Sequence, residues 1–268
     1  FFYICLMQNN NPIGLFDSGI GGTSIWKEIN HVLPFENSIY LADSKNAPYG
    51  RKSKDEIVEL CFKNTEYLLE QNCKLIVVAC NTATTNAITE LREKYDIPFI
   101  GIEPAIKPAV LKSKTQTIGI LATKGTLNSA LFHATIKKYT NVTFIEQVGT
   151  GLVELIETGK IYSQEMTYLL TKYLSPMIKQ NIDYLVLGCS HYPYLIPQIQ
   201  KILPKQVTII DSGVAVANQT RNILTHNNLL SKTNQKPKLD FYTNTDTSTM
   251  EFLLNENLNK ISIRIKSF

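Results

Sequence analysis

Two cysteines occupy equivalent places in two similar stretches of this sequence. The apolar run LIVVAC (75–80) ends in Cys80 and continues with Asn and Thr, whereas YLVLGC (184–189) ends in Cys189 and continues with Ser and His. Cysteines at strand ends that face helix N-termini have lowered pKa values, so thiolate is present near neutral pH. His191 can poise the Cys189 thiol or transfer protons itself. Two matched thiols therefore suggest a site with two equivalent reactive groups, one from each stretch.

Several chemistries compete for this pair. A zinc site needs three or four ligands, and a Cys-x-His pair with one distant cysteine is sparse for it. A structural disulfide is unusual in a reducing cytoplasm. Acyl transfer by a Cys–His pair needs only one cysteine and leaves Cys80 unexplained. Buried inert thiols are the simplest alternative.

Proton transfer at carbon is the chemistry that uses both thiols. One thiolate removes a proton from a stereocentre as the carbon becomes planar, and the opposite thiol delivers a proton to the other face, which inverts the centre. The sequence carries no signature of a pyridoxal cofactor or a metal site. We therefore expect no cofactor, and the negative charge must be met by preorganised hydrogen-bond donors.

The segment DSGIGG (17–22) lies between an expected strand and an expected helix, where backbone N–H groups and the helix dipole favour an anion. Its glycine spacing does not match the dinucleotide fingerprint, and no Gly-Lys-Ser/Thr follows as in a P-loop. A small carboxylate is therefore the expected guest. Neutral donors at the expected strand ends also suit a carboxylate, although each can instead cap a helix. They are Ser18, Asn81, Thr82, Thr123, Thr126 and Ser190.

The elements that must position these residues alternate between β-rich runs and stretches of helical period, as in a parallel α/β fold. Runs of Leu, Ile and Val without alternation indicate strands buried on both faces, and the residue after such a strand points into the crevice where open α/β sheets bind ligands. The first half predicts strands at 13–16, 38–42, 75–79 and 98–102, and helices at 23–33, 53–71 and 84–95.

The same pattern then repeats. IGILATKGTLNS (118–129) lines up with IGLFDSGIGGTS (13–24). The runs at 142–146, 184–189 and 207–211 match those at 38–43, 75–80 and 98–103 at nearly constant spacing. Chance similarity among generic βα units is the alternative to an internal duplication. A duplication would place Cys80 opposite Cys189 across an approximate two-fold axis.

The expected architecture is therefore two pseudo-symmetric α/β domains with parallel sheets and the active site in the cleft between them. We expect the domain with Cys80 to comprise residues 12–104 plus 212–268, and the domain with Cys189 to comprise residues 105–211. The C-terminal part should add a helix at 213–224 and strands at 239–242 and 261–265.

Composition limits the partners of the chain. Its 268 residues are 44% hydrophobic and 19% charged, with a formal net charge of +4. No Lys/Arg cluster is interleaved with aromatics, so we expect no nucleic-acid partner, and no apolar run approaches the roughly 18 residues of a membrane span. Five cysteines without close pairs favour the cytoplasm. We assign Cys61 and Cys73 to packing. Residues 1–11 are expected to be a tail without structural role, which makes Cys5 an exposed thiol.

Five motifs together resemble bacterial glutamate racemase, of the aspartate/glutamate racemase superfamily. They are DSGIGG (17–22), PYG (48–50), CNTA (80–83), GIEP (101–104) and GCSHYP (188–193). The resemblance covers about residues 12–215 and is weak in the C-terminal part. Ser190 departs from the family, which usually has Thr there, but the hydroxyl is retained. The resemblance implies a cofactor-independent, homodimeric enzyme that interconverts L- and D-glutamate to supply D-glutamate for peptidoglycan, with two α/β domains that close over the substrate.

The resemblance also implies roles for single residues. Cys80 and Cys189 would be the two acid/bases, Asp17 would assist Cys80, and Glu154 and His191 would assist Cys189. Glu154 can alternatively be only a carboxylate at a helix start. The implied substrate contacts are Asp17, Ser18, Tyr49, Gly50, Asn81, Thr82, Thr123, Ser190 and His191.

Two other functions stay open. An aspartate racemase of the same superfamily differs only in the room left for the side-chain carboxylate, which the sequence does not measure. A catalytically silent, two-lobed binding protein for an acidic amino acid is the alternative from another class. The matched thiols argue against it, because binding alone needs neither.

Overall fold

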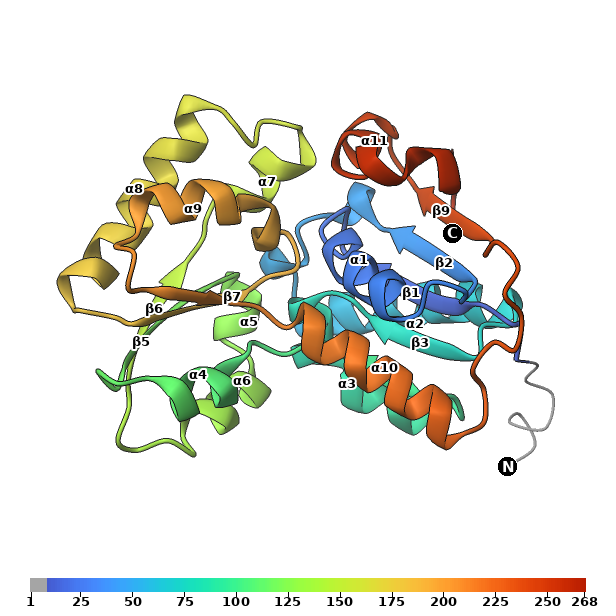
Figure 1. Cartoon of the computed structure of the whole chain (residues 1–268), viewed down its shortest axis with the longest axis horizontal. Coiled ribbons are helices and arrows are strands. Elements are labelled where there is room, and N and C mark those ends of the chain that lie inside the picture. The colour runs from blue at the N-terminus through green and yellow to red at the C-terminus, as the bar shows by residue number, and fades with distance from the viewer. Residues whose placement is uncertain (1–8) are drawn as a thin grey trace.

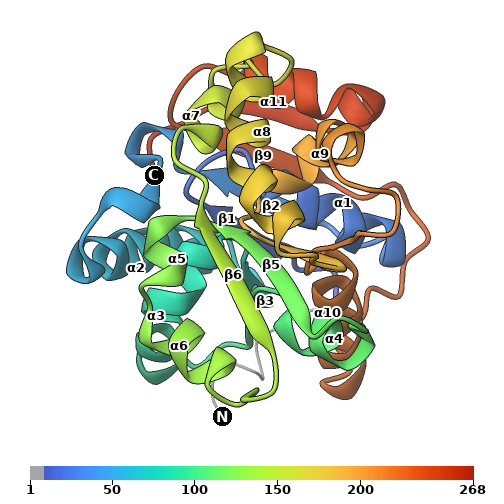
Figure 2. The same ribbon diagram turned by 90° about the vertical axis from the view of Figure 1, so that its left-hand side faces the viewer.

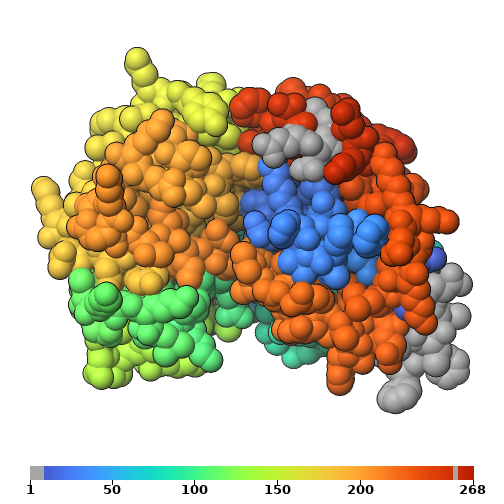
Figure 3. Space-filling view, viewed as in Figure 1, coloured from blue at the N-terminus to red at the C-terminus, as the bar shows by residue number. Residues whose placement is uncertain are grey.

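The computed structural model describes residues 9–268, apart from the side chains of residues 256–258. In this range the chain forms two lobes, each built on one parallel sheet with helices on both faces (Figure 1). The space-filling view shows the lobes meeting along a seam, with a notch at the lower edge (Figure 3). The predicted α/β class is confirmed. Among the described residues, every helix is too short or too polar to cross a membrane. Cys5 lies outside the described residues.

The first sheet has six strands in the order β10-β9-β2-β1-β3-β4. Its strands are β1 (Ile13–Asp17), β2 (Ser38–Ala42), β3 (Leu75–Val78), β4 (Phe99–Gly101), β9 (Leu239–Thr243) and β10 (Ser262–Ile265). Its helices are α1 (Thr23–Val32), α2 (Lys54–Glu70), α3 (Asn81–Lys94), α10 (Gly213–His226) and α11 (Ser248–Leu253), with the 3₁₀ turns η2 (Ser44–Asn46), η3 (Tyr49–Arg51) and η5 (Asn255–Lys260).

Both faces of this sheet are apolar, as the unbroken hydrophobic runs predict. Successive side chains of a strand point to opposite faces. Leu15 and Val77 pack with residues of α1 and α10, whereas Phe16 and Val78 pack with residues of α2 and α3. The C-terminal strands β9 and β10 extend the sheet beyond β2, so the end of the chain returns to the first lobe.

The second sheet has four strands in the order β6-β5-β7-β8. Its strands are β5 (Thr117–Ala122), β6 (Thr143–Val148), β7 (Tyr184–Gly188) and β8 (Thr208–Ile210). Its helices are α4 (Ile106–Lys112), α5 (Lys124–Leu127), α6 (Ala130–Ile136), α7 (Leu152–Glu157), α8 (Gln164–Lys179) and α9 (Ile196–Ile202), with the 3₁₀ turn η4 (Tyr192–Leu195). Helices α8 and α9 pack on one face and α4 and α6 on the other (Figure 2).

The two sheets share one strand order in their central parts. The order is β2-β1-β3-β4 in the first sheet and β6-β5-β7-β8 in the second, which pairs the strands as the repeated sequence pattern predicts. Gly14 in β1 and Gly119 in β5 are equivalent. A Cβ on Gly14 would lie 2.9 Å from Cys73 Sγ, and one on Gly119 would lie 2.9 Å from Ile182 Cδ1. Both glycines thus let the segment before the third strand pack closely, and Cys73 serves in packing.

Helix α3 begins at Asn81, not at Thr84 as the sequence predicts. Cys80 is its N-cap, and Cys80 Sγ accepts a hydrogen bond from Ala83 N at 3.4 Å. Asn and Thr are weak helix formers, so the helical pattern of this segment becomes visible only in its second turn. The earlier start matters for function because it places Cys80 directly at a helix N-terminus.

A buried lysine fastens the N-terminal segment to the first sheet. Lys74 Nζ donates to Glu36 Oε2 at 2.6 Å, to Leu229 O at 2.8 Å and to Asn9 O at 2.5 Å. Both charged side chains are buried. The sequence predicts that residues 1–11 are a tail without structural role. This prediction is wrong for Asn9, whose carbonyl oxygen accepts a hydrogen bond from Lys74.

Candidate active site

A small cavity between the lobes is lined by residues that follow the central strands of both sheets. Ser18 follows β1, Cys80 follows β3, Thr123 follows β5 and Cys189 follows β7. The remaining lining residues are Pro48, Tyr49, Gly50, Asn81, Thr82, Val153, Ser190 and His191. The cavity volume is about 10 Å³, which is about the room that one water molecule needs. Both thiols of the predicted pair therefore line one small cavity.

Cys80 is buried at the N-terminus of α3. Besides accepting from Ala83 N, its Sγ donates to Ser18 Oγ at 3.6 Å. Burial and the nearby charge of Asp17 raise the pKa of Cys80 well above its usual range, and the opposing hydrogen bonds do not cancel them. The expectation of a lowered pKa is therefore wrong for this thiol in the closed cleft, because desolvation outweighs the helix N-terminus. In this structure Cys80 is therefore a protonated thiol, which can donate a proton.

Cys189 has a different partner, the imidazole of His191. Cys189 Sγ lies 3.8 Å from His191 Nδ1, and His191 Nε2 lies 2.5 Å from Glu157 Oε1. Burial alone lowers the pKa of His191, but the contacts with Cys189 and Glu157 outweigh it and raise this pKa well above its usual range. A protonated imidazole can donate from both nitrogens. His191 can therefore exchange a proton with Cys189 while Glu157 holds the ring.

The carboxylates of Asp17, at the end of β1, and of Glu157, at the end of α7, accept hydrogen bonds from the glycine-rich turn that follows β1. Asp17 accepts hydrogen bonds from Ser18 N at 2.7 Å and Gly22 N at 2.6 Å, and Glu157 accepts from Ile20 N at 2.7 Å. The sequence predicts that this turn binds the carboxylate of a small ligand. In the structure, carboxylates of the protein itself lie there. Ser18 N, Ile20 N and Gly22 N hold two carboxylates of the protein itself, so these three donors are not free for a substrate carboxylate.

The Asp17 carboxylate also reaches the second lobe. Ser190 Oγ donates to Asp17 Oδ2 at 3.2 Å, and His191 Nδ1 lies 4.0 Å from the same oxygen. Burial raises the pKa of Asp17, and the positive charge of His191 opposes this shift. Asp17 thus stands between the Cys80 side and the Cys189 side of the cavity.

The predicted polar donors divide into engaged and free groups. Thr82 Oγ1 and Thr123 Oγ1 lie 2.8 Å apart and join the two lobes. Thr123 also caps α5 by accepting from Thr126 N at 3.2 Å, as the capping alternative predicts. Asn81 differs, because its Nδ2 is buried and has no hydrogen-bond partner among the described residues. A buried amide without a partner is unfavourable, so this donor is suited to a bound acceptor.

Tyr49 and Gly50 line the cavity without offering it a free hydroxyl. The Tyr49 hydroxyl donates to Asp43 Oδ2 at 2.6 Å and is thereby engaged. Gly50 lies against the second lobe, where a Cβ on it would be 3.1 Å from Thr123 Cβ. The absence of a side chain at this position lets the two lobes approach closely.

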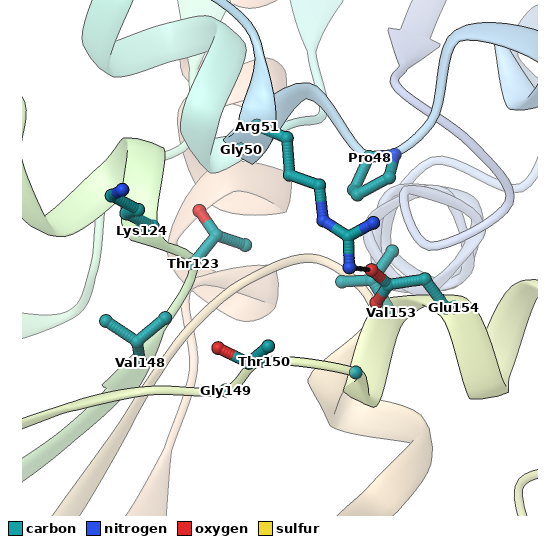
Figure 4. Close-up of a pocket in the computed structure, with 11 residues that line it drawn as sticks. Pro48, Gly50, Arg51, Thr123, Lys124, Val148, Gly149, Thr150, Val153 and Glu154 are labelled. Atoms are coloured by element: carbon teal, nitrogen blue, oxygen red, sulfur yellow. Dashed lines mark ion pairs between the residues drawn. The ribbon is translucent and has the colours of Figure 1, made fainter.

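Glu154 does not occupy the place that the resemblance implies. Its carboxylate forms an ion pair with Arg51 at the rim of a neighbouring pocket (Figure 4). The carboxylate that contacts His191 is Glu157, which lies three positions further along α7. Positions i and i+3 lie one turn apart on nearly the same helix face. The sequence contains both glutamates in LVELIE, and its periodicity does not tell which one reaches the histidine.

Comparison with known proteins identifies the family. A family model described as Asp/Glu/Hydantoin racemase matches residues 13–220. The chain belongs to this racemase family. It is 45% identical over 226 residues to a glutamate racemase from Ectopseudomonas mendocina, which covers 84% of this chain and 86% of the relative. The predicted enzyme class, an amino-acid racemase, is confirmed.

Solved racemase structures share the fold. A glutamate racemase isoform from Bacillus anthracis superposes with a TM-score of 0.87 at 32% identity, over 97% of this chain and 99% of the other. A glutamate racemase from Francisella tularensis, solved in complex with D-glutamate, gives 0.83 at 32% identity, over 97% and 98%. An aspartate racemase from Picrophilus torridus gives 0.55 at 18% identity, over 82% and 99%, which shows a common fold.

Proposed function

We propose that this racemase interconverts L- and D-glutamate by proton transfer between Cys80 and Cys189. The observation that carries the proposal is that the two thiols follow equivalent strands of the two sheets and line one cavity. One thiolate takes the α-proton, and the electron pair left on carbon is delocalised into the α-carboxylate. The opposite thiol then gives its proton to the other face. The thiol and thiolate exchange roles, so the reverse reaction restores the starting state.

The surrounding residues support different thiols. Asp17 is proposed to assist Cys80, whose pKa it influences directly. His191 is proposed to assist Cys189, from which its Nδ1 is 3.8 Å away. We propose Glu157, in place of Glu154, as the carboxylate that orients His191. This assignment rests on the 2.5 Å contact between Glu157 Oε1 and His191 Nε2.

Substrate recognition is proposed to use donors from both lobes. The free amide of Asn81 is the strongest candidate for a substrate carboxylate, because no described residue satisfies it. The hydroxyls of Thr82 and Thr123 can exchange their mutual hydrogen bond for bonds to substrate once the lobes separate. The other proposed contacts are Ser18, Tyr49, Gly50, Ser190 and His191, which line the cavity, and Asp17, which lies behind it and accepts a hydrogen bond from Ser190.

Glutamate is favoured over aspartate because the similar curated relatives that span most of the chain are glutamate racemases. The likeness to an aspartate racemase extends to the fold alone. We further propose that the reaction needs no cofactor, that it supplies D-glutamate for peptidoglycan, and that the enzyme acts as a homodimer in the cytoplasm. Residues 12–104 with 212–268, and residues 105–211, are proposed as its two domains.

The proposal is tested by incubating the purified, reduced protein in D₂O, separately with L-glutamate and with L-aspartate and without added cofactor. Loss of circular dichroism for glutamate, with deuterium at the α-carbon of the product enantiomer by NMR, is the expected result. Cys80→Ser and Cys189→Ser should each abolish racemisation, whereas Cys61→Ser, in the core, should keep most of it. Near-normal turnover of either active-site variant would refute the two-base scheme. Racemisation of aspartate alone would identify the other substrate, and inertness toward both would favour a binding protein.

A further inference from the structure

The cavity around the two thiols is too small for any amino acid. Its volume is about 10 Å³, and Cys80 and Cys189 are 4% and 6% exposed. A substrate that reaches these sulfurs must therefore enter through a separation of the lobes. The chain crosses between the sheets at two places, and these crossovers touch, because Ser212 Oγ donates to Glu103 O. Rotation about this paired crossover can open the cleft without breaking either sheet.

A larger pocket of about 270 Å³ adjoins the thiol cavity. Four residues line both spaces, namely Pro48, Gly50, Thr123 and Val153. The larger pocket is therefore the space next to the thiols through which a substrate can approach. Figure 4 shows the Arg51 side chain extending across this pocket to Glu154.

Arg51 and Glu154 come from different lobes. Arg51 ends η3, next to the Tyr49–Gly50 backbone of the first lobe, whereas Glu154 lies in α7 of the second lobe. Their side chains are 64% and 34% exposed. Ion pairs with this exposure are weak and are screened by salt, so thermal motion breaks them readily. A contact of this strength can hold two lobes together for part of the time and still release them.

We propose that the Arg51–Glu154 ion pair is a latch that closes the mouth of the thiol cleft and controls substrate access. The role in substrate access rests on the proposed function. The ion pair and its effect on the exposure of the thiols do not depend on that function. When the pair is formed, the thiols are shielded from water. When it breaks, the closed form loses one of the contacts between its lobes, beside those of Thr82 with Thr123 and of Glu157 with Ile20, so the lobes separate more often and the pocket then becomes continuous with the thiol cavity.

Alkylation of the thiols by iodoacetamide tests the latch without turnover. Labelling of Cys80 and Cys189 is followed by mass spectrometry of their peptides in the wild-type protein, in Arg51→Gln and in Glu154→Gln. Both substitutions remove the pair, so each should speed labelling of both thiols about two- to fivefold, and the double variant should be no faster than either single one. Higher salt should speed wild-type labelling and leave the variants unchanged.

Two controls separate latch opening from other effects. Lys54 and Glu90 form an ion pair within the first lobe, with side chains 60% and 31% exposed, so Glu90→Gln should label as the wild type does. Cys61, which is fully buried in the core, reports unfolding and should stay unlabelled throughout.

The latch is refuted if both variants label at the wild-type rate. It is also refuted if Arg51→Gln and Glu154→Gln shift the rate in opposite directions, because that result would reflect local charge alone. Failure of the proposed racemisation would leave these labelling rates untouched, so the two hypotheses are tested separately.

Discussion

Replacement of Glu157 by Gln is the sharpest test of the proposed acid–base arrangement. Glu157 Oε1 accepts from His191 Nε2 at 2.5 Å and from Ile20 N at 2.7 Å, and its Oε2 accepts from Ser44 Oγ at 2.8 Å. Gln keeps the shape but loses the charge and one acceptor oxygen. A hydrogen bond to a charged group contributes about 1.5–3 kcal/mol. We therefore expect kcat/KM to fall about tenfold to a hundredfold.

The assay follows circular dichroism from L-glutamate and from D-glutamate in separate progress curves. Enantiomers have equal free energies, so kcat/KM must fall by the same factor in both directions. Glu154→Gln is the matched control, because Glu154 pairs with exposed Arg51, and we expect it to change kcat/KM by no more than about fivefold. A larger loss in Glu154→Gln than in Glu157→Gln would overturn the assignment of the carboxylate.

The same variant should change the pH dependence of stability. The folded state raises the pKa of His191, so protonated His191 contributes stability that is fully present below about pH 6.5 and is lost as pH rises through the raised pKa. Glu157→Gln removes one cause of that shift. The difference in Tm between wild type and variant should therefore be largest near pH 6.5 and shrink toward alkaline pH. A difference that grows with pH would contradict this sign.

Three further variants test other parts of the structure. Asn81→Ala should raise KM for glutamate about tenfold with little loss of Tm, because the amide nitrogen has no described partner to lose; an unchanged KM would exclude the proposed contact. Lys74→Met should cost about 3–5 kcal/mol in urea unfolding, because it leaves Glu36 buried without its cation, and adding Glu36→Gln should recover part of the loss. Gly14→Ala should cost about 1–3 kcal/mol by crowding Cys73, with partial recovery in the Gly14→Ala/Cys73→Ala double variant; no recovery would place the crowding elsewhere.

The sequence was informative wherever burial alone decides the structure. Strands covered on both faces must be apolar throughout, so β1, β3, β5 and β7 stand out as unbroken hydrophobic runs. The repeat of these runs predicts the shared strand order, and it places both thiols at equivalent strand ends. Gly14 and Gly119 recur in the repeat because equivalent strands meet equivalent neighbours.

The sequence was less informative where the answer depends on contacts between lobes. Glu154 and Glu157 both follow the turn after β6, and only the packing of α7 against the first lobe decides that Glu157 reaches His191. The pKa of Cys80 is a second example. A helix N-terminus favours thiolate, but its effect is smaller than those of burial and Asp17, which are visible only in three dimensions.

The repeat also shows where the two halves have diverged. In the alignment of the halves, Asp17 corresponds to Ala122 and His191 corresponds to Thr82, whereas the two cysteines correspond to each other. The proposed bases are thus equivalent, but one has a carboxylate beside it and the other an imidazole. The ratio kcat/KM is equal for the two enantiomers and cannot report this asymmetry. We therefore expect it in kcat and KM taken separately and in the isotope effects of substrates deuterated at the α-carbon. Identical isotope effects from L- and D-glutamate would mean that both thiols are assisted alike, and the proposed division between Asp17 and His191 would then be wrong.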